Sequence, residues 1–156
     1  LLKSTGNVKD SVDKLVSENS SLKKTIEKFE AKSAELVINE LINKAVTVNE
    51  MTFLSGQFDT ESPEMLKNIA FRLRKSSENT VLAIGSSSGG KANIVIMVSD
   101  NLVSKKNISA TSLIKEISGE INGGGGGQPF LATAGGKKPA GIDSALKKVF
   151  LLIQKS

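Results

Sequence analysis

The first part of the chain carries apolar residues at helical spacing. Two heptad positions are marked, one by Leu15, Leu22, Phe29 and Leu36 and the complementary one by Val12 and Ile26. Asn19 and Ser33 interrupt the second position, and a broader apolar run follows over residues 37–42. The pattern predicts one long amphipathic helix from Val12 to about Lys44, which packs against a neighbouring segment or another subunit.

After Glu50 the pattern changes to that of a small α/β unit. Strands are predicted at residues 51–58, 80–84 and 93–98, the last two as a hairpin joined by a flexible turn over residues 85–90. Helices are predicted from Pro63, with Ser62 as N-cap, to about Ser76, and over residues 110–121 and 143–154. We therefore expect residues 1–50 to be a helical spacer and residues 51–156 to fold as one β-α-β-β-α-loop-α domain.

Five consecutive glycines, Gly123–Gly127, form the most informative stretch. They precede Gln128 and Pro129, and a second pair follows at Gly135–Gly136. Glycine adopts positive φ freely and lets another backbone approach closely. Consecutive N–H groups in such a loop can hold an anion. A flexible linker has a similar composition, but the apolar helix before the glycines favours a built element, so we expect an anion-binding loop.

These residues resemble the DHHA1 domain, which closes alanyl-tRNA synthetases and accompanies DHH-type phosphoesterases. The resemblance lies in a helix ending Ile-Ser-Gly-Glu-Ile, the glycine loop, Pro129, the small residues 131–134, Gly135–Gly136 and a terminal helix. The helix start at residues 61–66, the strand at 81–84 and the long preceding helix are similar to the synthetase C-terminal region. The resemblance implies a mixed-sheet α/β (α+β) fold preceded by the long helix.

What the resemblance implies for function is a tRNA partner. The parent would be an ATP-dependent alanine–tRNA ligase with Mg and Zn as further cofactors. This region would bind alanine-specific tRNA at its elbow and link aminoacylation with editing. Because the chain begins Leu1-Leu2 without Met, we expect a fragment. Two other functions stay open: the accessory nucleic-acid-binding domain of a DHH-type phosphoesterase, which Asp/His metal motifs would precede, and an oligomerisation module using the helix or the domain.

The glycine loop departs from the family pattern. The family commonly reads Gly-Gly-Lys-Gly-Gly-Gly-Arg-Pro-Asp, whereas this chain has Gly124 for the lysine, Gln128 for the arginine and Phe130 for the aspartate. Two charges suited to phosphate are absent, so we expect weaker contacts from backbone N–H groups and Gln128. Lys137 and Lys138, directly after the motif, are candidates to replace them.

Composition limits the chemistry. There is no cysteine and no histidine, which excludes disulfides, thiol nucleophiles, Cys/His zinc sites and imidazole bases in this chain. The acidic residues show no ligand spacing, so no cofactor, metal or catalytic residue is expected here. The lack of cysteine suits the cytoplasm, and no apolar run approaches the ~20 residues of a membrane span.

Charge indicates where a polyanion would bind. The net charge is +5, and residues 1–50 balance eight lysines against eight acids, so the excess lies in residues 51–156. A lysine surplus also serves a solvated surface, and cations at a helix C-terminus also complement its dipole. Since no aromatic is placed to stack on bases, recognition of backbone shape is expected. The RNA-binding candidates are Gly123, Gly124, Gly125, Gly126, Gly127, Gln128, Lys105, Lys106, Lys137, Lys138, Arg72 and Arg74.

Overall fold

The computed structural model describes residues 6–59 and 62–156. Contacts divide the chain into two units, residues 1–35 and 36–156. Glu61, at the start of the expected synthetase-like helix, lies outside the described residues. That an independent domain begins at Met51 stays a prediction.

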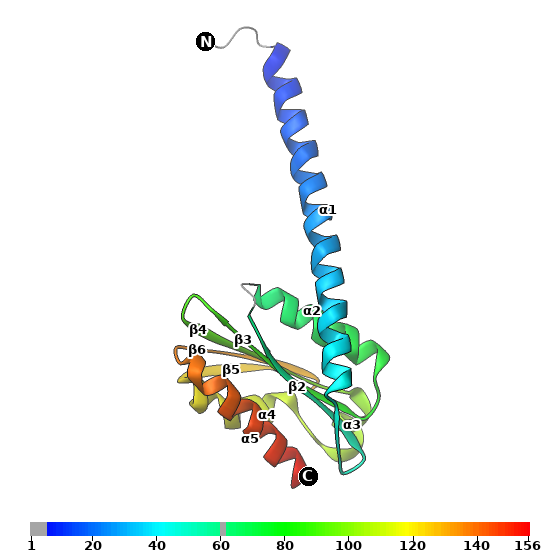
Figure 1. The fold of residues 1–156 in the computed structure, drawn as a ribbon, viewed down its shortest axis with the longest axis vertical. Helices are drawn as coiled ribbons and strands as arrows, with labels where there is room; N and C mark the ends of the chain where they lie inside the picture. Colours follow the sequence, from blue (N-terminus) through cyan, green and yellow to red (C-terminus); the bar gives the residue numbers. More distant parts are fainter. Residues whose placement is uncertain (1–5, 60–61) are drawn as a thin grey trace. The chain divides into compact units, whose positions relative to one another are not determined.

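Helix α1 (Gly6–Asn43) confirms the long helix that the heptad pattern predicted (Figure 1). All six apolar heptad residues are exposed, among them Leu15 by 64%, Leu22 by 62% and Phe29 by 68%. Further along the same helix, in the second unit, Leu41 is buried and lies against Gly56. None of the described helices is long and apolar enough to cross a membrane.

The second unit is built on a mixed sheet, as predicted. Within the described residues its strand order is β1-β2-β3-β4-β6-β5. The strands are β1 (Val46–Val48), β2 (Met51–Phe58), β3 (Thr80–Ser88), β4 (Lys91–Val98), β6 (Leu131–Gly136) and β5 (Gly123–Gln128). Strands β2 and β3 are parallel, and a helix makes the crossover connection that a parallel pair requires. The other neighbouring strands are antiparallel.

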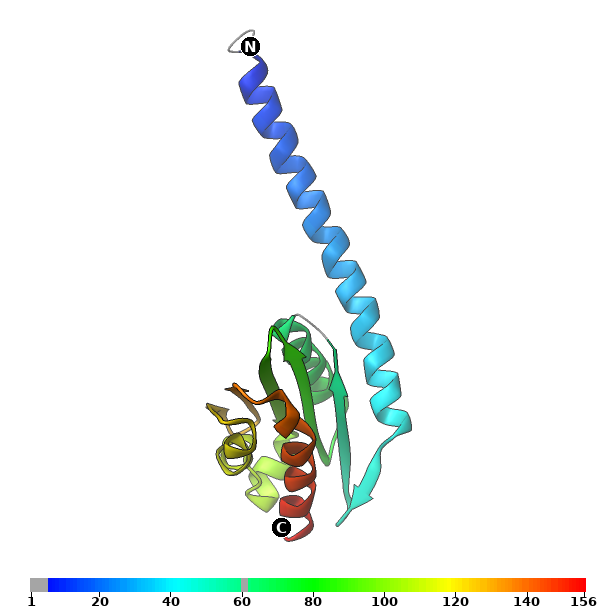
Figure 2. The same ribbon diagram turned by 60° about the vertical axis from the view of Figure 1, so that its left-hand side comes forward.

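Helices cover both faces of the central strands. Helix α2 (Pro63–Ser76) packs on β3 and β4, and it buries Leu66, Ile69, Ala70 and Leu73. On the other face, α4 (Ala110–Ile117) packs on β4, β5 and β6, while α5 (Ile142–Gln154) packs on β2 and β3 (Figure 2). Alternate residues of β3 and β4 point to opposite faces, and both faces are buried, which explains their continuous apolar runs.

The predicted flexible turn over residues 85–90 was wrong. Gly85–Ser88 continue strand β3, and the connection to β4 is only Gly89–Gly90, with φ of +55° and +73°. Two successive positive φ values are typical of a tight two-residue hairpin turn. Gly85 belongs to the strand because Ile142 packs on it: a Cβ there would lie 2.4 Å from Ile142 Cγ2. The serines at 86–88 have the composition of a loop, although they continue the strand.

Two further elements differ from the sequence-based prediction. A short helix, α3 (Asp100–Lys106), was not predicted. The helix expected over residues 110–121 ends as an α-helix at Ile117 and continues as the 3-10 helix η1 (Ser118–Ile121). A second 3-10 turn, η2 (Pro139–Gly141), leads into α5.

Candidate nucleic-acid interface

The glycine segment is an edge strand, not the loop that the sequence predicted. Residues 123–128 form β5 and pair antiparallel with β6, from Gly123 opposite Gly136 to Gln128 opposite Leu131. Among the five glycines, only Gly127 has a positive φ, at +154°. The backbone is therefore extended, and its N–H groups do not converge on one anion in the way a left-handed glycine loop would allow.

Close contact with β6 explains the glycines at every second position. A Cβ on Gly123, Gly125 or Gly127 would lie 1.9, 2.2 or 2.4 Å from a backbone oxygen of β6. Glycine is otherwise unfavourable in strands, because it brings no side chain to pack and loses more backbone freedom on folding. The close approach of β6 requires glycine despite its low strand propensity. A prediction from propensity alone therefore gives a loop.

The intervening glycines have no such steric reason. A Cβ on Gly124 or Gly126 would meet nothing within 4 Å. These two residues share a face of β5 with Gln128, and that face presents bare backbone to solvent. Because β5 ends the strand order of the described sheet, its outer edge also leaves every second N–H and C=O group unpaired. Such an edge offers donors to an anion without side chains in the way.

The turn between β5 and β6 is fixed at the neighbouring elements. The N–H of Val98 donates to the carbonyl oxygen of Phe130 at 2.9 Å. The N–H of Ala110, at the start of α4, donates to the carbonyl oxygen of Pro129 at 2.7 Å. Both bonds hold the tip of the hairpin against the end of β4 and the beginning of α4.

Arg74, an RNA-binding candidate, is engaged at this same turn. Its Cζ lies 3.6 Å from the centroid of the Phe130 ring. Its Nε donates to Oδ1 of Asp100 at 3.0 Å and its Nη2 to Oδ2 at 3.3 Å, and the ion pair between Nη2 and Oδ1 measures 2.9 Å. The Arg74 side chain is 28% exposed, so most of this cation is committed to contacts within the protein. Arg72 lies exposed on the same helix.

Lys105 and Lys106 lie in the last turn of α3, a helix that the sequence did not predict, where a cation is favourable. The Lys106 ammonium also donates to the carbonyl oxygen of Asn49 at 2.9 Å, and Asn49 Nδ2 donates to the carbonyl oxygen of Gln154 at 3.0 Å. Lys106 thus ties the β1–β2 turn to the domain.

Lys137 and Lys138 are the candidates that the fold brings to the glycine strand. Both are exposed directly after β6, beside the first residue of β5. The N–H of Lys138 donates to the carbonyl oxygen of Ile121 at 3.0 Å, which fixes the backbone there. Sequence reasoning missed Lys91, the exposed first residue of β4, because only the strand register places it at the same end of the sheet.

The described residues hold no group of three or more acidic side chains that could bind a metal ion. What the arrangement offers is exposed lysines and bare strand backbone. The lysines can bind phosphate as point charges, and the bare backbone allows a polyanion to approach closely.

Comparison with known proteins identifies the domain. The DHHA1 domain matches residues 43–155. The chain belongs to the DHHA1 family. The sequence-based resemblance to the synthetase C-terminal region is likewise confirmed. The DHHA1 chain is 34% identical to an alanine–tRNA ligase of Cytophaga hutchinsonii over 99% of its own length. It is 37% identical to that of Bacteroides fragilis over 97%.

These relatives are much longer. The DHHA1 chain spans 18% of the Cytophaga protein and 17% of the Bacteroides protein. Among solved structures, it resembles the C-Ala domain of alanyl-tRNA synthetase from Aquifex aeolicus, with a TM-score of 0.65 and 34% identity over 70% of this chain and 97% of that one. A DHH-domain protein of the s1p family of ribosomal proteins shares the fold alone, with a TM-score of 0.53 at 16% identity over 80% of this chain and 31% of that one.

Proposed function

We propose that this chain is the tRNA-binding C-terminal part of an alanine–tRNA ligase, where it contacts the tRNA elbow and links aminoacylation with editing. The observation that carries the proposal is its match to alanine–tRNA ligases over 99% of its length. The C-Ala resemblance points to the same part of such an enzyme, because 97% of that domain is covered.

The physical basis of binding would be contact with phosphates. The basic excess lies in residues 51–156, and exposed lysines stand beside the open backbone of β5. Lysine ammonium groups neutralise phosphates and release counterions, so affinity should fall steeply with salt. Recognition would then follow the shape of the folded RNA, since phosphate contacts carry no sequence information.

The chemistry would belong to the remainder of the enzyme. ATP, Mg and Zn would bind there, in the cytoplasm, and this part would hold the tRNA while its acceptor end is charged or edited. The alternative of a phosphoesterase accessory domain has a weaker basis, because the DHH-domain structure shares only the fold.

The direct test is binding of the chain to alanine-specific tRNA at increasing salt, followed by fluorescence anisotropy. A folded tRNA should bind more tightly than a duplex RNA of equal length. Absence of binding at low salt, or equal affinity for both RNA shapes, would contradict elbow recognition.

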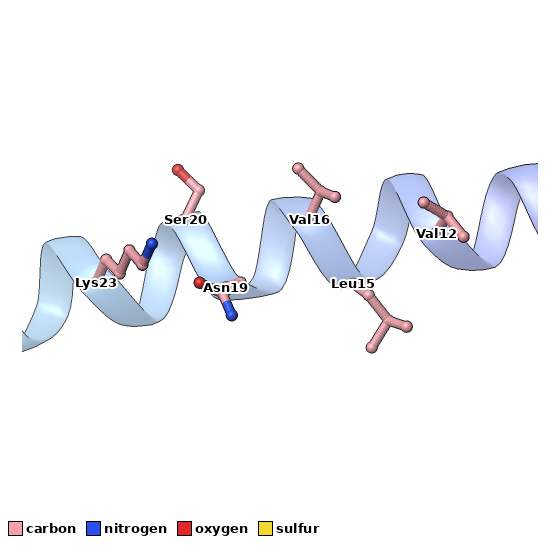
Figure 3. A pocket seen from close by; sticks show the side chains of 6 residues that line it. All are labelled: Val12, Leu15, Val16, Asn19, Ser20 and Lys23. Atoms are coloured by element: carbon pink, nitrogen blue, oxygen red, sulfur yellow. The ribbon is translucent and has the colours of Figure 1, made fainter.

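Self-association is a second candidate function, favoured by the exposed apolar side chains of α1. Figure 3 shows six side chains that follow one another at alternating spacings of three and one: Val12, Leu15, Val16, Asn19, Ser20 and Lys23. Apolar residues at heptad spacing on an exposed helix are typical of a coiled-coil seam. A second copy of α1 would cover Leu15 and Leu22. Sedimentation at increasing protein concentration tests whether it does.

A further inference from the structure

The register of β4 and β6 brings two lysines together at one end of the sheet. Ala92 lies opposite Gly136, in the last pair of this antiparallel ladder. Lys91 directly precedes Ala92 and Lys137 directly follows Gly136, so the two lysines flank this last pair. Residues that flank one end of an antiparallel ladder lie close in space, and those at matching places in the alternation share a face of the sheet. The two residues are 46 positions apart in the sequence, because α3, α4, η1 and β5 lie between their strands. No local sequence motif therefore shows the pair.

Among the described residues, neither lysine is paired with an acidic side chain. Both are exposed, and no ion pair found among residues 6–59 and 62–156 includes Lys91, Lys137 or Lys138. Two acidic residues lie on nearby elements. Glu120 on η1 is paired with Lys148 at 3.2 Å, and Asp59 follows β2, which β3 separates from β4.

Like charges directly opposite on adjacent strands destabilise a sheet. A pair without a local acid is relieved when an external anion lies between the two ammonium groups. Each lysine has three donors and no acceptor, so a phosphate can accept from both.

The surroundings leave room for a long polyanion. The Gly89–Gly90 turn precedes Lys91, and a Cβ on either glycine would meet nothing within 4 Å. On the other side of Lys137 lies the start of β5, where Gly124 is equally open. The two lysines therefore stand between two stretches of unhindered backbone.

We propose that Lys91 and Lys137 form a phosphate-binding pair that contacts the RNA backbone beside the glycine strand. The proposal rests on the tRNA-binding function proposed above and adds to it a residue of β4, outside the glycine motif. Among polyanions, the observations favour RNA over an acidic protein segment. The bare backbone on both sides offers no apolar pocket for side chains, whereas a phosphate chain needs only charge and space.

The test compares four variants of the whole chain: Lys91→Ala, Lys137→Ala, the double variant, and Lys115→Ala as control. Lys115 is an exposed lysine on α4, which packs against the opposite face of the sheet. Labelled tRNA is titrated at several salt concentrations, and unlabelled polyglutamate is used as a competitor. Each single change should lower the slope of log K against log salt by about 0.9, and the double by about twice that. The control should leave the slope unchanged.

A second readout needs no RNA. Removing one of two like charges should leave the melting temperature at low salt unchanged or raise it, which shows that lost binding does not come from lost folding. If wild type binds tRNA and both single variants match Lys115→Ala, the lysine pair is wrong and the proposed function stands. If wild type does not bind tRNA at low salt, the proposed function itself fails. Displacement of tRNA by an equal charge concentration of polyglutamate would overturn the choice of RNA.

Discussion

The guanidinium of Arg74 lies over the ring of Phe130, with Cζ 3.6 Å from the ring centroid. Phe130 stands at the turn that leads out of the glycine strand, and Arg74 stands near the end of α2. Asp100 holds the same guanidinium from the first turn of α3. A strand without side chains on one face has few means of fixing its own position, so contacts at its turn decide where it lies.

We predict that Arg74 and Phe130 are energetically coupled. Arg74→Ala, Phe130→Ala and the double variant form a cycle whose coupling should be about 1 kcal/mol, because a partly buried cation–π contact has this size. Urea unfolding measures it. Additive effects of the two single changes would show that the contact contributes nothing.

The same variants separate a structural from an RNA-binding role. Arg74→Ala should change the salt dependence of tRNA binding no more than Lys75→Ala, an exposed cation beside it in the sequence. A loss of about one unit of salt slope in Arg74→Ala alone would instead restore Arg74 as a phosphate contact.

The elements that the sequence predicted well are those whose formation depends on residues close to one another in the sequence. Pro63 begins α2, and apolar residues at helical spacing in α1, α2 and α5 define their buried or exposed faces. Strand β5 differs, because its cause is distant in sequence. Residue 125 has to be glycine because a Cβ there would lie 2.2 Å from the carbonyl oxygen of Thr133, and nothing in the local sequence shows that close approach.

The candidate site was predicted only in part for a similar reason. Lys137 could be chosen because it follows the glycine motif. Lys91 could not, because its place beside Lys137 depends on which residues of β4 and β6 face each other. The position of Lys106 at the end of a helix could not be predicted either, because α3 was not predicted.

We predict an alternation in how the glycine strand tolerates side chains. Gly125→Ala should destabilise the fold by about 1–3 kcal/mol, since its Cβ would overlap the backbone of β6. Gly124→Ala, one residue away in open space, is the matched control and should change the free energy of unfolding by less than about 1 kcal/mol. Urea unfolding distinguishes them. Equal destabilisation by both would contradict the strand geometry.

Restoring the charges of the family motif should strengthen RNA binding. Gly124→Lys has room for its side chain, and Gln128→Arg replaces an exposed residue on the same face of β5. Each change should steepen the slope of log K against log salt by about 0.9. The titration is repeated with Gly124→Glu, which should weaken binding through repulsion. If the lysine and glutamate variants bind alike, this face of β5 does not contact RNA.

The last prediction concerns α1. If a second copy covers the heptad residues, Leu15→Glu and Leu22→Glu should each shift sedimentation towards monomer, because two like charges would then lie in an apolar seam. Lys23→Glu, next to Leu22 but outside the two heptad positions, should leave association nearly unchanged. Asn19 occupies the interrupted heptad position, where a polar residue limits stability and fixes register. Asn19→Ile should therefore strengthen association and allow more than one oligomeric state. Monomeric wild type at the highest concentration would rule out this surface as a homodimer interface, and the exposed leucines would then need a different neighbour.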